Sequence, residues 1–508
     1  MAKYKSYNYS QTVMLPVSLE DQLTPGTLEF AINTLVEERM DMTRFDAKFK
    51  NDETGCKAYN PKILLKIILL AYSRGIVHSR KIERECKRNV TFMALSCGQE
   101  PDHSTIAAFV SSLKDEIKPL FRDVLLVCEE MQLLGGTEFS LDGCKLPSNA
   151  STRFSGTFAT LQEKKEKLER RVGYMLEEEV EADKQEETDR SEERKRAKHI
   201  EKLKKEAAKI AEFLEKNEPK PGKQFKEVRS NVTDNESAMM TTSHGTIQGY
   251  NGQVLIDAKN QVIVEGEAFG WGQDDYHLEP VVSGAQENME AIGKEDDYFK
   301  AAILTADTGY HSSKSIKKCE DDGIDAYIPD KDYRKRHPGL EVKKSSIDRR
   351  RKRFSLEDFR YDEGVDEYEC PAGKRLKLHT RSQKSRWGMV YWAYRADARD
   401  CEVCTEREGC ISKKGKRGTR KYLMIPVASE RRNYSQEMAA KMDTDRGREI
   451  YPHRMRIVEP VFANIRTQKR LDRFTMRGKI KVNIQWLLYC MVHNIEKIVN
   501  FGPEFAVV

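Results

Sequence analysis

The sequence lacks a long uninterrupted apolar run. Its most apolar stretch, Ile63 to Tyr72, is interrupted by Lys66 and is shorter than the roughly 20 residues that a helix needs to cross a bilayer. The first residues, MAKYKSYNYSQ, also lack the apolar core of a secretion signal. Since 33% of the residues are charged, we expect a cytoplasmic protein without a membrane-spanning segment.

The chain also lacks a strong excess of one charge and a paired set of cysteines. Its net charge is only +6 over 508 residues, so bulk charge does not indicate nucleic acid as a partner. Local Lys and Arg clusters such as 348–354 are either phosphate-binding patches or solvated faces. The 11 cysteines are odd in number and follow no secretion signal, which argues against a disulfide framework.

Residues 1–130 are typical of a helical domain. The segment 61–75 begins with Pro61 and carries a thick apolar stripe, and Ser79 and Asp102 are expected N-caps of the next helices. Short basic helices in series suit a DNA-binding domain of the helix-turn-helix kind. A plain helical bundle that serves assembly gives the same pattern.

Strand and helix signals alternate through 131–159 and 219–330, which predicts a mixed α/β sheet. The sequence FSLDGCKL (139–146) predicts a short strand that ends near Asp142 and Gly143. The later expected elements are a strand–turn–strand at 253–269, a helix at 277–292, a strand ending at Asp307, a short helix and a further strand.

A helical insertion is predicted at 160–218. Apolar residues recur at helical spacing on both sides of a polar stretch, at Leu161, Leu168, Val172, Leu176 and Val180 and then at Ile200, Leu203, Ala207, Ile210 and Leu214. Such steps of three and four residues are typical of a coiled coil. We expect an antiparallel hairpin within one chain, with one long helix or pairing between two protomers as the alternatives.

Residues 331–445 are expected to form an irregular, basic insertion. Cys370, Cys401, Cys404 and Cys410 follow the spacing C-x30-C-x2-C-x5-C, which a structural Zn²⁺ site can use, and His379 could replace one of them. Reduced thiols without metal are the alternative. Zinc would stabilise an insertion that has little core of its own.

Two acidic residues, Asp142 and Asp307, are both expected at strand ends beside a glycine. Short carboxylates on rigid strands can hold hard divalent cations, although an Asp in such a place often only caps a turn. A third carboxylate is expected from the helical segment 446–508. Glu459 and Glu496 compete for that role, with the neutral Gln485 as a weaker alternative.

Several stretches resemble the bacterial insertion-sequence DDE transposases. FSLDGCKLPSNAS, LTADTGYHS and YPHRMRIVEPVFANIR resemble the three acidic motifs of that family, and PKILLK and PDHSTIAAF resemble its N-terminal domain. The resemblance implies a ribonuclease H-like α/β core with the first Asp on the first strand and the second on the fourth. It places the Glu on a late helix after an insertion, which favours Glu459.

The family signature around the Glu is Tyr, two residues, Arg, three residues, Glu, six residues, Lys. This chain has Tyr451, Arg454, Glu459 and Arg466, with four residues between Arg454 and Glu459, so Arg456 is an alternative for the Arg role. Arg466 keeps the charge of the Lys but changes the donor geometry. The resemblance implies that these basic residues and Tyr451 contact DNA.

The resemblance further implies a DNA transposase that holds two Mg²⁺ or Mn²⁺ ions at Asp142, Asp307 and Glu459. Such an enzyme cuts at the terminal inverted repeats of its element and joins the 3′-hydroxyl to target DNA. It would act as a homodimer at the bacterial nucleoid. The alternatives are a metal-dependent nuclease without strand transfer and a non-enzymatic, zinc-bearing coiled-coil protein that binds DNA.

Overall fold

The computed structural model divides the chain into two compact units, one of Met1–Asp330 with Thr444–Val508 and one of Lys331–Asp443. It describes residues 18–48, 57–182, 190–222, 227–243, 245–337, 354, 356–384, 390–411, 419–426 and 434–502. The basic cluster 348–354 lies outside the described residues except for Phe354. Among the described helices, none combines the length and apolar character that a bilayer crossing requires.

The N-terminal region is helical, as predicted. Its α-helices are α1 (Leu28–Thr34), α2 (Pro61–Ser73), α3 (Ser79–Arg88), α4 (Val90–Leu95), α5 (His103–Ser112) and α6 (Ile117–Glu130). Asn60 caps α2 by accepting from the Lys62 amide, and Asp102 caps α5 as expected. Ser79 is the first residue of α3 and not its cap, since the cap position falls on His78.

A six-stranded mixed sheet forms the centre of the larger unit. Its strands are β1 (Glu138–Pro147), β6 (Ala238–Thr242), β7 (Gly245–Asp257), β8 (Ile263–Phe269), β9 (Ile303–Ala306) and β10 (Asp325–Tyr327). The order is β10-β9-β1-β7-β6, with β8 also paired to β7. Strand β9 runs parallel to β1 and β10, whereas β7 runs antiparallel to β1, β6 and β8. This arrangement confirms a mixed α/β fold.

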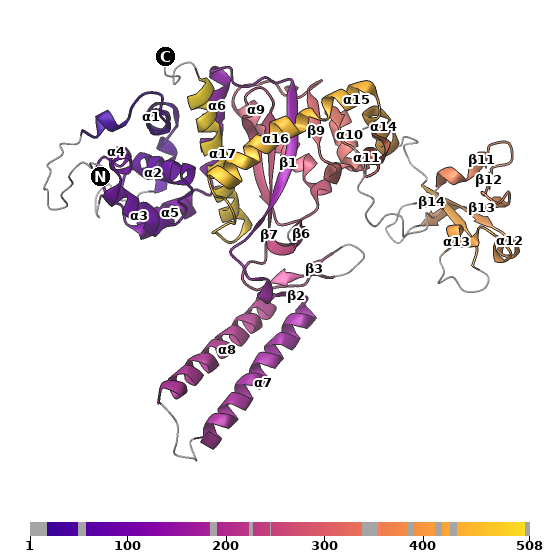
Figure 1. Ribbon diagram of the computed structural model, residues 1–508, viewed down its shortest axis with the longest axis horizontal. Helices are drawn as coiled ribbons and strands as arrows, with labels where there is room; N and C mark the ends of the chain where they lie inside the picture. The colour runs from indigo at the N-terminus through magenta and orange to yellow at the C-terminus, as the bar shows by residue number, and fades with distance from the viewer. Residues whose placement is uncertain are drawn as a thin grey trace, which may run out of the picture. The chain divides into compact units, whose positions relative to one another are not determined.

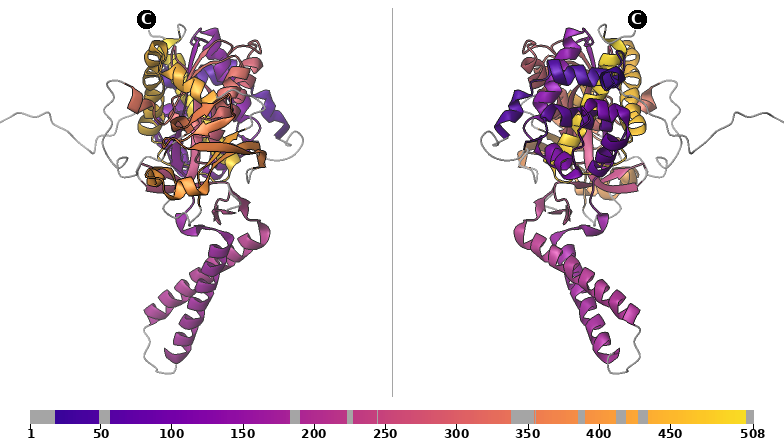
Figure 2. Two further views of the ribbon diagram at one scale, coloured as in Figure 1. Left: turned by 90° about the vertical axis from the view of Figure 1, so that its right-hand side faces the viewer. Right: turned by 90° about the vertical axis from the view of Figure 1, so that its left-hand side faces the viewer.

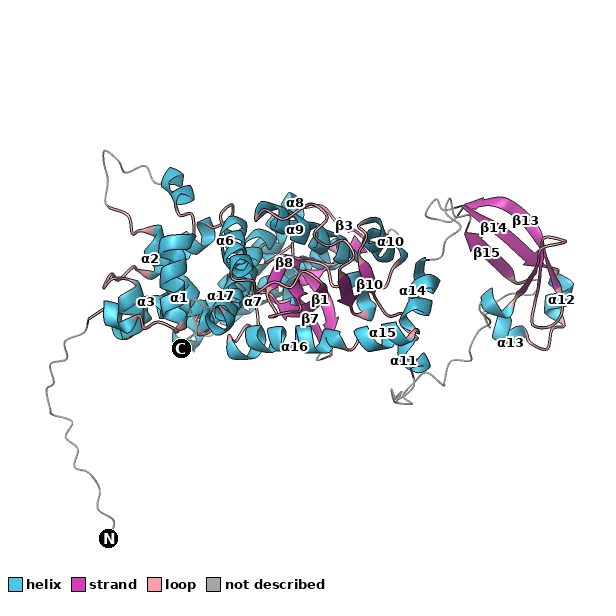
Figure 3. Ribbon diagram, turned by 90° about the horizontal axis from the view of Figure 1, so that it is seen from above, coloured by secondary structure: helices cyan, strands magenta, loops and turns pink. Residues whose placement is uncertain are grey.

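Helices cover both faces of this sheet (Figures 1 and 3). Successive residues of β8 show the two sides: the Glu265 carboxylate accepts from Asn288 of α9 (Leu278–Ala291), and a Cβ on Gly266 would meet Cys490 of α17 (Lys479–Phe501). Because side chains alternate along a strand, α9 and α17 lie on opposite faces. Helix α16 (His453–Ala463) packs against β1, and α10 (Ser313–Asp321) and α15 (Asp445–Ile450) complete the unit.

Two asparagines of α17 protect the backbone of β8. The Asn483 amide both accepts from the Ala268 N–H (2.7 Å) and donates to the Ala268 carbonyl (3.1 Å). Asn494 does the same at Ile263, at 2.9 and 2.8 Å. An edge strand with unpaired backbone groups invites pairing with other chains. These side chains satisfy those groups and fix the position of the last helix on the sheet.

A buried carboxylate predicts a pH-dependent stability. Burial raises the pKa of Glu265 from 4.5 to about 7, and the residue is 1% exposed. Since the folded chain holds this proton more tightly, stability should fall as pH rises from 4.5 to 7 and then level off. The variant Glu265→Gln keeps an acceptor for Asn288 and should be more stable than the wild type at pH 8, by roughly 1–3 kcal/mol.

Chemical unfolding at pH 4.5 and pH 8 measures this effect, with similar stabilities of variant and wild type expected at pH 4.5. The matched control is Glu267→Gln on the same strand, because Glu267 is 29% exposed and ion-paired with Lys479. The control should retain most of the pH dependence of unfolding, because burial is the largest cause of the raised Glu265 pKa and the Glu267 charge a smaller one. A Glu265→Gln protein that is less stable than the wild type at pH 8 would contradict the prediction.

The predicted helical insertion is a pair of long helices, α7 (Phe158–Ala182) and α8 (Arg190–Lys216), which lie side by side (Figures 1 and 2). Leu161 near the start of α7 packs with Ile210 near the end of α8, and Val172 packs with Ile200, so the helices are antiparallel. One predicted contact is wrong: Leu176 is 38% exposed. The side chain of Val180 lies outside the described residues.

Short strand pairs adjoin the helix pair, β2 (Ser155–Gly156) with β5 (Ser230–Asn231) and β3 (Lys220–Pro221) with β4 (Glu227–Val228). Val232, which follows β5, packs in the same cluster as Leu161 and Ile210. The end of the helix pair that carries the two chain connections therefore has an apolar core of its own. Pairing within one chain is what the structure shows.

The smaller unit is more regular than predicted. Its strands β11 (Arg360–Asp362), β12 (Glu367–Glu369), β13 (Arg375–Lys384), β14 (Val390–Ala396) and β15 (Tyr422–Pro426) form one antiparallel sheet in chain order. Its α-helices are α11 (Tyr333–Arg336), α12 (Ala398–Glu402), α13 (Arg407–Cys410) and α14 (Tyr434–Met442). Leu376, Tyr394 and Leu423 are buried at its centre, so the expectation of an irregular segment with little core of its own is wrong.

Candidate active site

Asp142 and Asp307 lie next to each other across two neighbouring parallel strands. The last paired residues of β1 and β9 are Leu141 and Ala306, so Asp142 and Asp307 follow as the next positions of the same register. Parallel strands run about 4.8 Å apart, and residues in register point to the same face. The topology of the sheet therefore brings together the two acidic residues that the sequence analysis selected.

The sequence predicts Asp142 at the end of a strand, but the strand continues beyond it. Strand β1 continues to Pro147, and Asp142 pairs with Val254 of β7. Gly143, which we interpreted as a strand end, is needed for another reason. A Cβ there would lie 2.1 Å from the side-chain nitrogen of Gln253, so only glycine leaves room for that amide. The glycine marks a close approach within the sheet and not a turn.

Arg454 of α16 is bound to Asp142. Its Nη2 donates to the Asp142 Oδ2 at 2.9 Å, and the Arg454 and Asp142 side chains are 9% and 21% exposed. Burial raises the pKa of Asp142, the Arg454 guanidinium opposes the rise, and the charge of Asp307 adds to it. Burial lowers the pKa of Arg454, but Asp142 and Asp307 more than offset this. Arg454 therefore neutralises part of the charge of both carboxylates.

Asp307 is exposed and also acts as a cap. Its side chain accepts from the Thr308 amide at 2.7 Å, at the start of the 3-10 turn Thr308–Tyr310. The simple capping role that the sequence suggested is thus present. One of its two oxygens suffices for that bond, and an exposed carboxylate beside Asp142 remains accessible to a ligand.

The three candidates for the third acidic position differ in their surroundings. Glu459 lies on α16, five residues after Arg454, and is exposed, without a hydrogen bond or ion pair to the described residues. Glu496 accepts from Lys469, whose side chain is 1% exposed, and from Asn464 at 2.8 Å. Gln485 is buried and accepts from the Thr475 amide at 3.0 Å. Glu496 and Gln485 therefore have structural partners.

The remaining signature residues occupy different places. Arg456 is exposed, and its carbonyl accepts from the Gln261 amide at 2.9 Å. Arg466 is exposed and near enough to Cys144 of β1 for its charge to act on the pKa of that thiol. Tyr451 lies one turn before Arg454 and accepts from its backbone N–H at 3.2 Å. The exposed Arg456 and Arg466 are open to a ligand, whereas Arg454 is directed at the acidic pair.

Asp274 is an acidic residue near the site that the sequence analysis missed. It accepts from Asn251 of β7 at 2.6 Å, and a Cβ on Gly309 would lie 2.8 Å from its Oδ2. The 3-10 turn that follows Asp307 therefore packs against Asp274. The acidic sequence GQDDY directly after β8 was the available signal, but nothing in it indicates which strand ends it adjoins.

The described residues contain no group of three or more His, Cys, Asp or Glu side chains arranged to hold a metal ion. This includes the acidic residues above and the cysteines of the smaller unit. Burial raises the pKa of the Cys410 thiol, and Cys401, Cys370 and Cys404 act in the same direction, so the four sulfurs share one neighbourhood. His379 lies near Arg395 and Tyr422. The ten described cysteines are free thiols.

Comparison with known protein families gives two matches in separate parts of the chain. The family "Transposase DDE domain" matches residues 369–499, which include Glu459 and the four cysteines, and "Transposase domain (DUF772)" matches residues 17–112 in the helical N-terminal region. No curated protein matches the chain. Asp142 and Asp307 lie outside both matched segments. Two transposase family models thus match this chain, one in its N-terminal region and one over the part that contains Glu459, and together they support an insertion-sequence DDE transposase.

Proposed function

We propose that this transposase cuts DNA at the ends of its own element and joins the released 3′-hydroxyl to target DNA, with Asp142, Asp307 and Glu459 as its acidic triad. The observation that carries the proposal is the register of β1 and β9, which sets Asp142 beside Asp307. Glu459 lies on α16, and α16 packs against β1. The two alternative functions are a nuclease without strand transfer and a non-enzymatic DNA-binding protein, and the experiment below distinguishes both from a transposase.

The sheet topology supports a ribonuclease H-like core. Counted without the short β6, the first three strands β1, β7 and β8 are antiparallel neighbours, and the fourth and fifth, β9 and β10, lie beyond β1 and run parallel to it. Asp142 is then on the first strand and Asp307 directly after the fourth. This is the placement that the family resemblance implies.

The donor set suits Mg²⁺, which prefers carboxylate oxygens and retains several waters. Asp142, Asp307 and Glu459 would hold the ions, and a bound pair of such ions supplies activation of the attacking oxygen and stabilisation of the leaving oxygen. Arg454 holds the Asp142 carboxylate in place at 2.9 Å and limits the repulsion between the two aspartates. The exposed Arg456 and Arg466 would bind DNA phosphates beside the site.

The test uses the full chain, Mg²⁺ and a duplex that carries the inverted repeats flanking this reading frame. Cleavage at the repeat ends is expected, together with transfer of pre-cleaved 3′-hydroxyl ends into a plasmid. Cleavage without transfer would favour the nuclease. Binding with no Mg²⁺-dependent cleavage of any end duplex would overturn the proposal and favour the non-enzymatic protein. Light scattering of the complex tests the homodimer that holding two ends requires.

We also propose a structural zinc ion at Cys370, Cys401, Cys404 and Cys410. Cys370, Cys401 and Cys410 all pack against the apolar centre of the smaller unit. The Cys370 sulfur accepts from the Lys374 backbone N–H at 3.3 Å, in a tight turn in which Gly373 has a φ of 72°. Backbone N–H groups directed at sulfur favour the thiolate form that binds zinc.

The expected result is close to one zinc per purified chain, measured by elemental analysis. Cys401→Ser and Cys404→Ser should each lose most of the zinc, because a tetrahedral site that loses one thiolate binds far more weakly. Cys97 is exposed and lies in the N-terminal region. Cys97→Ser is therefore the matched control, and it should retain the zinc. Zinc-free protein with the wild-type fold would rule out the site.

A further inference from the structure

A basic stripe runs along α8 on the side away from its contact with α7. Lys198, Lys202, Lys205 and Lys209 follow steps of four, three and four residues, which places them on one side of a helix. All four are exposed, and the apolar contact with α7 uses Ile200, Leu203, Ala207 and Ile210 instead. We call these four lysines the basic stripe.

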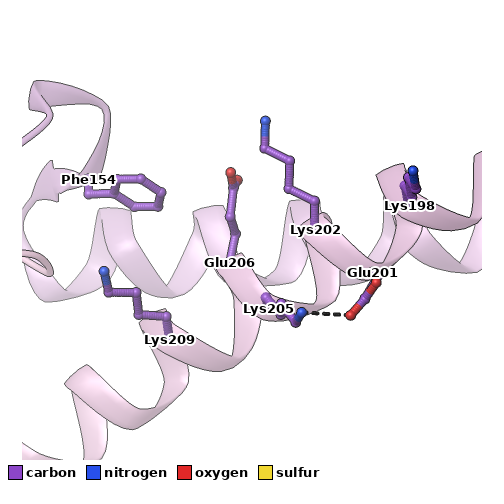
Figure 4. Close-up of a pocket in the computed structure, with 7 residues that line it drawn as sticks. All are labelled: Phe154, Lys198, Glu201, Lys202, Lys205, Glu206 and Lys209. Carbon is purple, nitrogen blue, oxygen red and sulfur yellow. Dashed lines mark ion pairs between the residues drawn. The ribbon is translucent and has the colours of Figure 1, made fainter. Parts of the chain in front are cut away.

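The stripe borders a shallow depression of about 360 Å³ that Phe154 closes at one end (Figure 4). Three cations converge on the Phe154 ring: Lys164 at 5.2 Å, Arg153 at 5.7 Å and Lys209 at 5.9 Å from its centroid. Cations prefer the face of an aromatic ring, which explains how three of them are held together. The ring thus gathers positive charge at the end of the stripe.

Acidic neighbours do not balance this charge. Glu201 pairs with Lys205 at 2.6 Å, and Glu206 pairs with Arg153 at 2.7 Å. Within the described part of the chain, Lys198 and Lys202 make no ion pair. Burial lowers the pKa of Lys164, and the charge of Arg153 lowers it further. Six cations thus face two carboxylates, and a multivalent anion would relieve their repulsion.

We propose that the basic stripe and the cations around Phe154 bind the phosphate backbone of duplex DNA. The stretch from Lys198 to Lys209 is about 16 Å long by the helical rise of 1.5 Å per residue. One strand of B-DNA presents a phosphate per 3.4 Å of axis but makes about half a turn over this length, so the straight stripe faces roughly two or three phosphates. An isolated anion would engage one or two lysines, whereas a linear series of phosphates matches the whole stripe.

The identification of DNA as the anion rests on the proposed function, but the position of the surface does not. The helix pair α7–α8 contains neither Asp142 nor Asp307, so its role would be to bind and orient DNA. Backbone contacts of this kind carry no base specificity and give a strong salt dependence. The helix pair then serves as a DNA-binding arm, which requires no pairing between protomers.

Two lysines on α8 provide a matched comparison. Lys202 belongs to the stripe, and Lys204 lies two residues later, about 200° around the helix; both are exposed and neither is ion-paired within the described residues. Binding of the full chain to a linear duplex is measured by fluorescence anisotropy in EDTA over a range of NaCl concentrations. Without divalent metal, binding is measured separately from cleavage.

Lys202→Glu should weaken binding about three- to tenfold and reduce the slope of log K against log salt by about one. Lys204→Glu should stay within about twofold of the wild type. The triple variant Lys198→Gln, Lys202→Gln, Lys209→Gln should reduce the slope by about two to three. Thermal unfolding verifies the fold, and Lys202→Gln replaces Lys202→Glu if the latter is unstable.

Equal effects of Lys202→Glu and Lys204→Glu, or no effect of the triple variant on the salt slope, would overturn the proposal. A change in mass by light scattering with DNA binding unchanged would also overturn it and assign the stripe to contact between copies of the chain. Failure of the wild type to cut any end duplex would refute the proposed function but would leave the binding comparison valid.

Discussion

Asp142→Asn and Asp307→Asn are each expected to reduce Mg²⁺-dependent cleavage of end DNA by about three orders of magnitude, or roughly 4 kcal/mol of transition-state stabilisation. Each substitution removes a carboxylate charge from the pair that β1 and β9 set side by side. The amide introduced by Asp142→Asn retains an acceptor for the Gly143 backbone N–H, which Asp142 binds at 2.8 Å. Binding of end DNA should therefore change little, whereas Asp142→Asn leaves the buried Arg454 with a neutral acceptor and should cost about 1–3 kcal/mol of stability.

A neighbouring ion pair supplies the control. Asp325 at the start of β10 pairs with Arg446 at 3.1 Å, as Asp142 pairs with Arg454 at 2.9 Å. Asp325→Asn makes the same chemical change on a strand of the same sheet and should leave cleavage intact. Initial rates on a labelled end duplex compare the three variants. If Asp142→Asn cleaves at the wild-type rate, Asp142 is not part of the catalytic site.

Local rules of helix and strand formation predicted much of the fold. Pro61 after the capping Asn60, and Asp102 before α5, mark helix starts that depend only on nearby backbone groups. The strand that ends before Asp307 and the helix pair within 160–218 also follow from local periodicity. These features need no information about distant parts of the chain.

The errors arise where a distant residue decides the local structure. Gly143 was interpreted as the end of a strand, whereas it makes room for the Gln253 side chain, 110 positions later. Arg454 was expected at DNA, but its guanidinium is buried against Asp142 on a different element. Leu176 continues the apolar spacing of α7 and is nevertheless exposed. Spacing alone could not determine these long-range contacts.

In the candidate site, too, some features depend on local residues and others on distant parts of the chain. The sequence indicated Asp142 and Asp307 by their residue types and neighbours, and the register of two strands places them together. Asp274 could not be selected, because its position beside Gly309 depends on how the chain after β8 meets the turn after β9. The family resemblance favours Glu459 over Glu496, and the structure adds that Glu496 has the buried Lys469 as its ion-pair partner.

Glu459→Gln should reduce cleavage as much as the two aspartate variants do, by about three orders of magnitude, without loss of stability. Glu459 is exposed and makes no hydrogen bond or ion pair with the described residues, so the folded chain loses no contact when its charge is removed. Helix α16 packs against β1 and holds this carboxylate near the sheet. Because the carboxylate has no structural partner among the described residues, it is available to a metal ion. Its isosteric amide lacks the charge that a divalent cation favours.

Glu496→Gln should have the opposite effect. Cleavage should be retained at temperatures at which the variant is folded, and thermal stability should be reduced. Lys469 is 1% exposed, burial lowers its pKa, and Glu496 is its ion-pair partner. Loss of that charge leaves a buried ammonium with only neutral acceptors, which costs about 1–3 kcal/mol. Thermal unfolding and initial cleavage rates, measured on both variants, separate the two roles. Cleavage that survives in Glu459→Gln but is lost in a stably folded Glu496→Gln would transfer the third acidic position to α17.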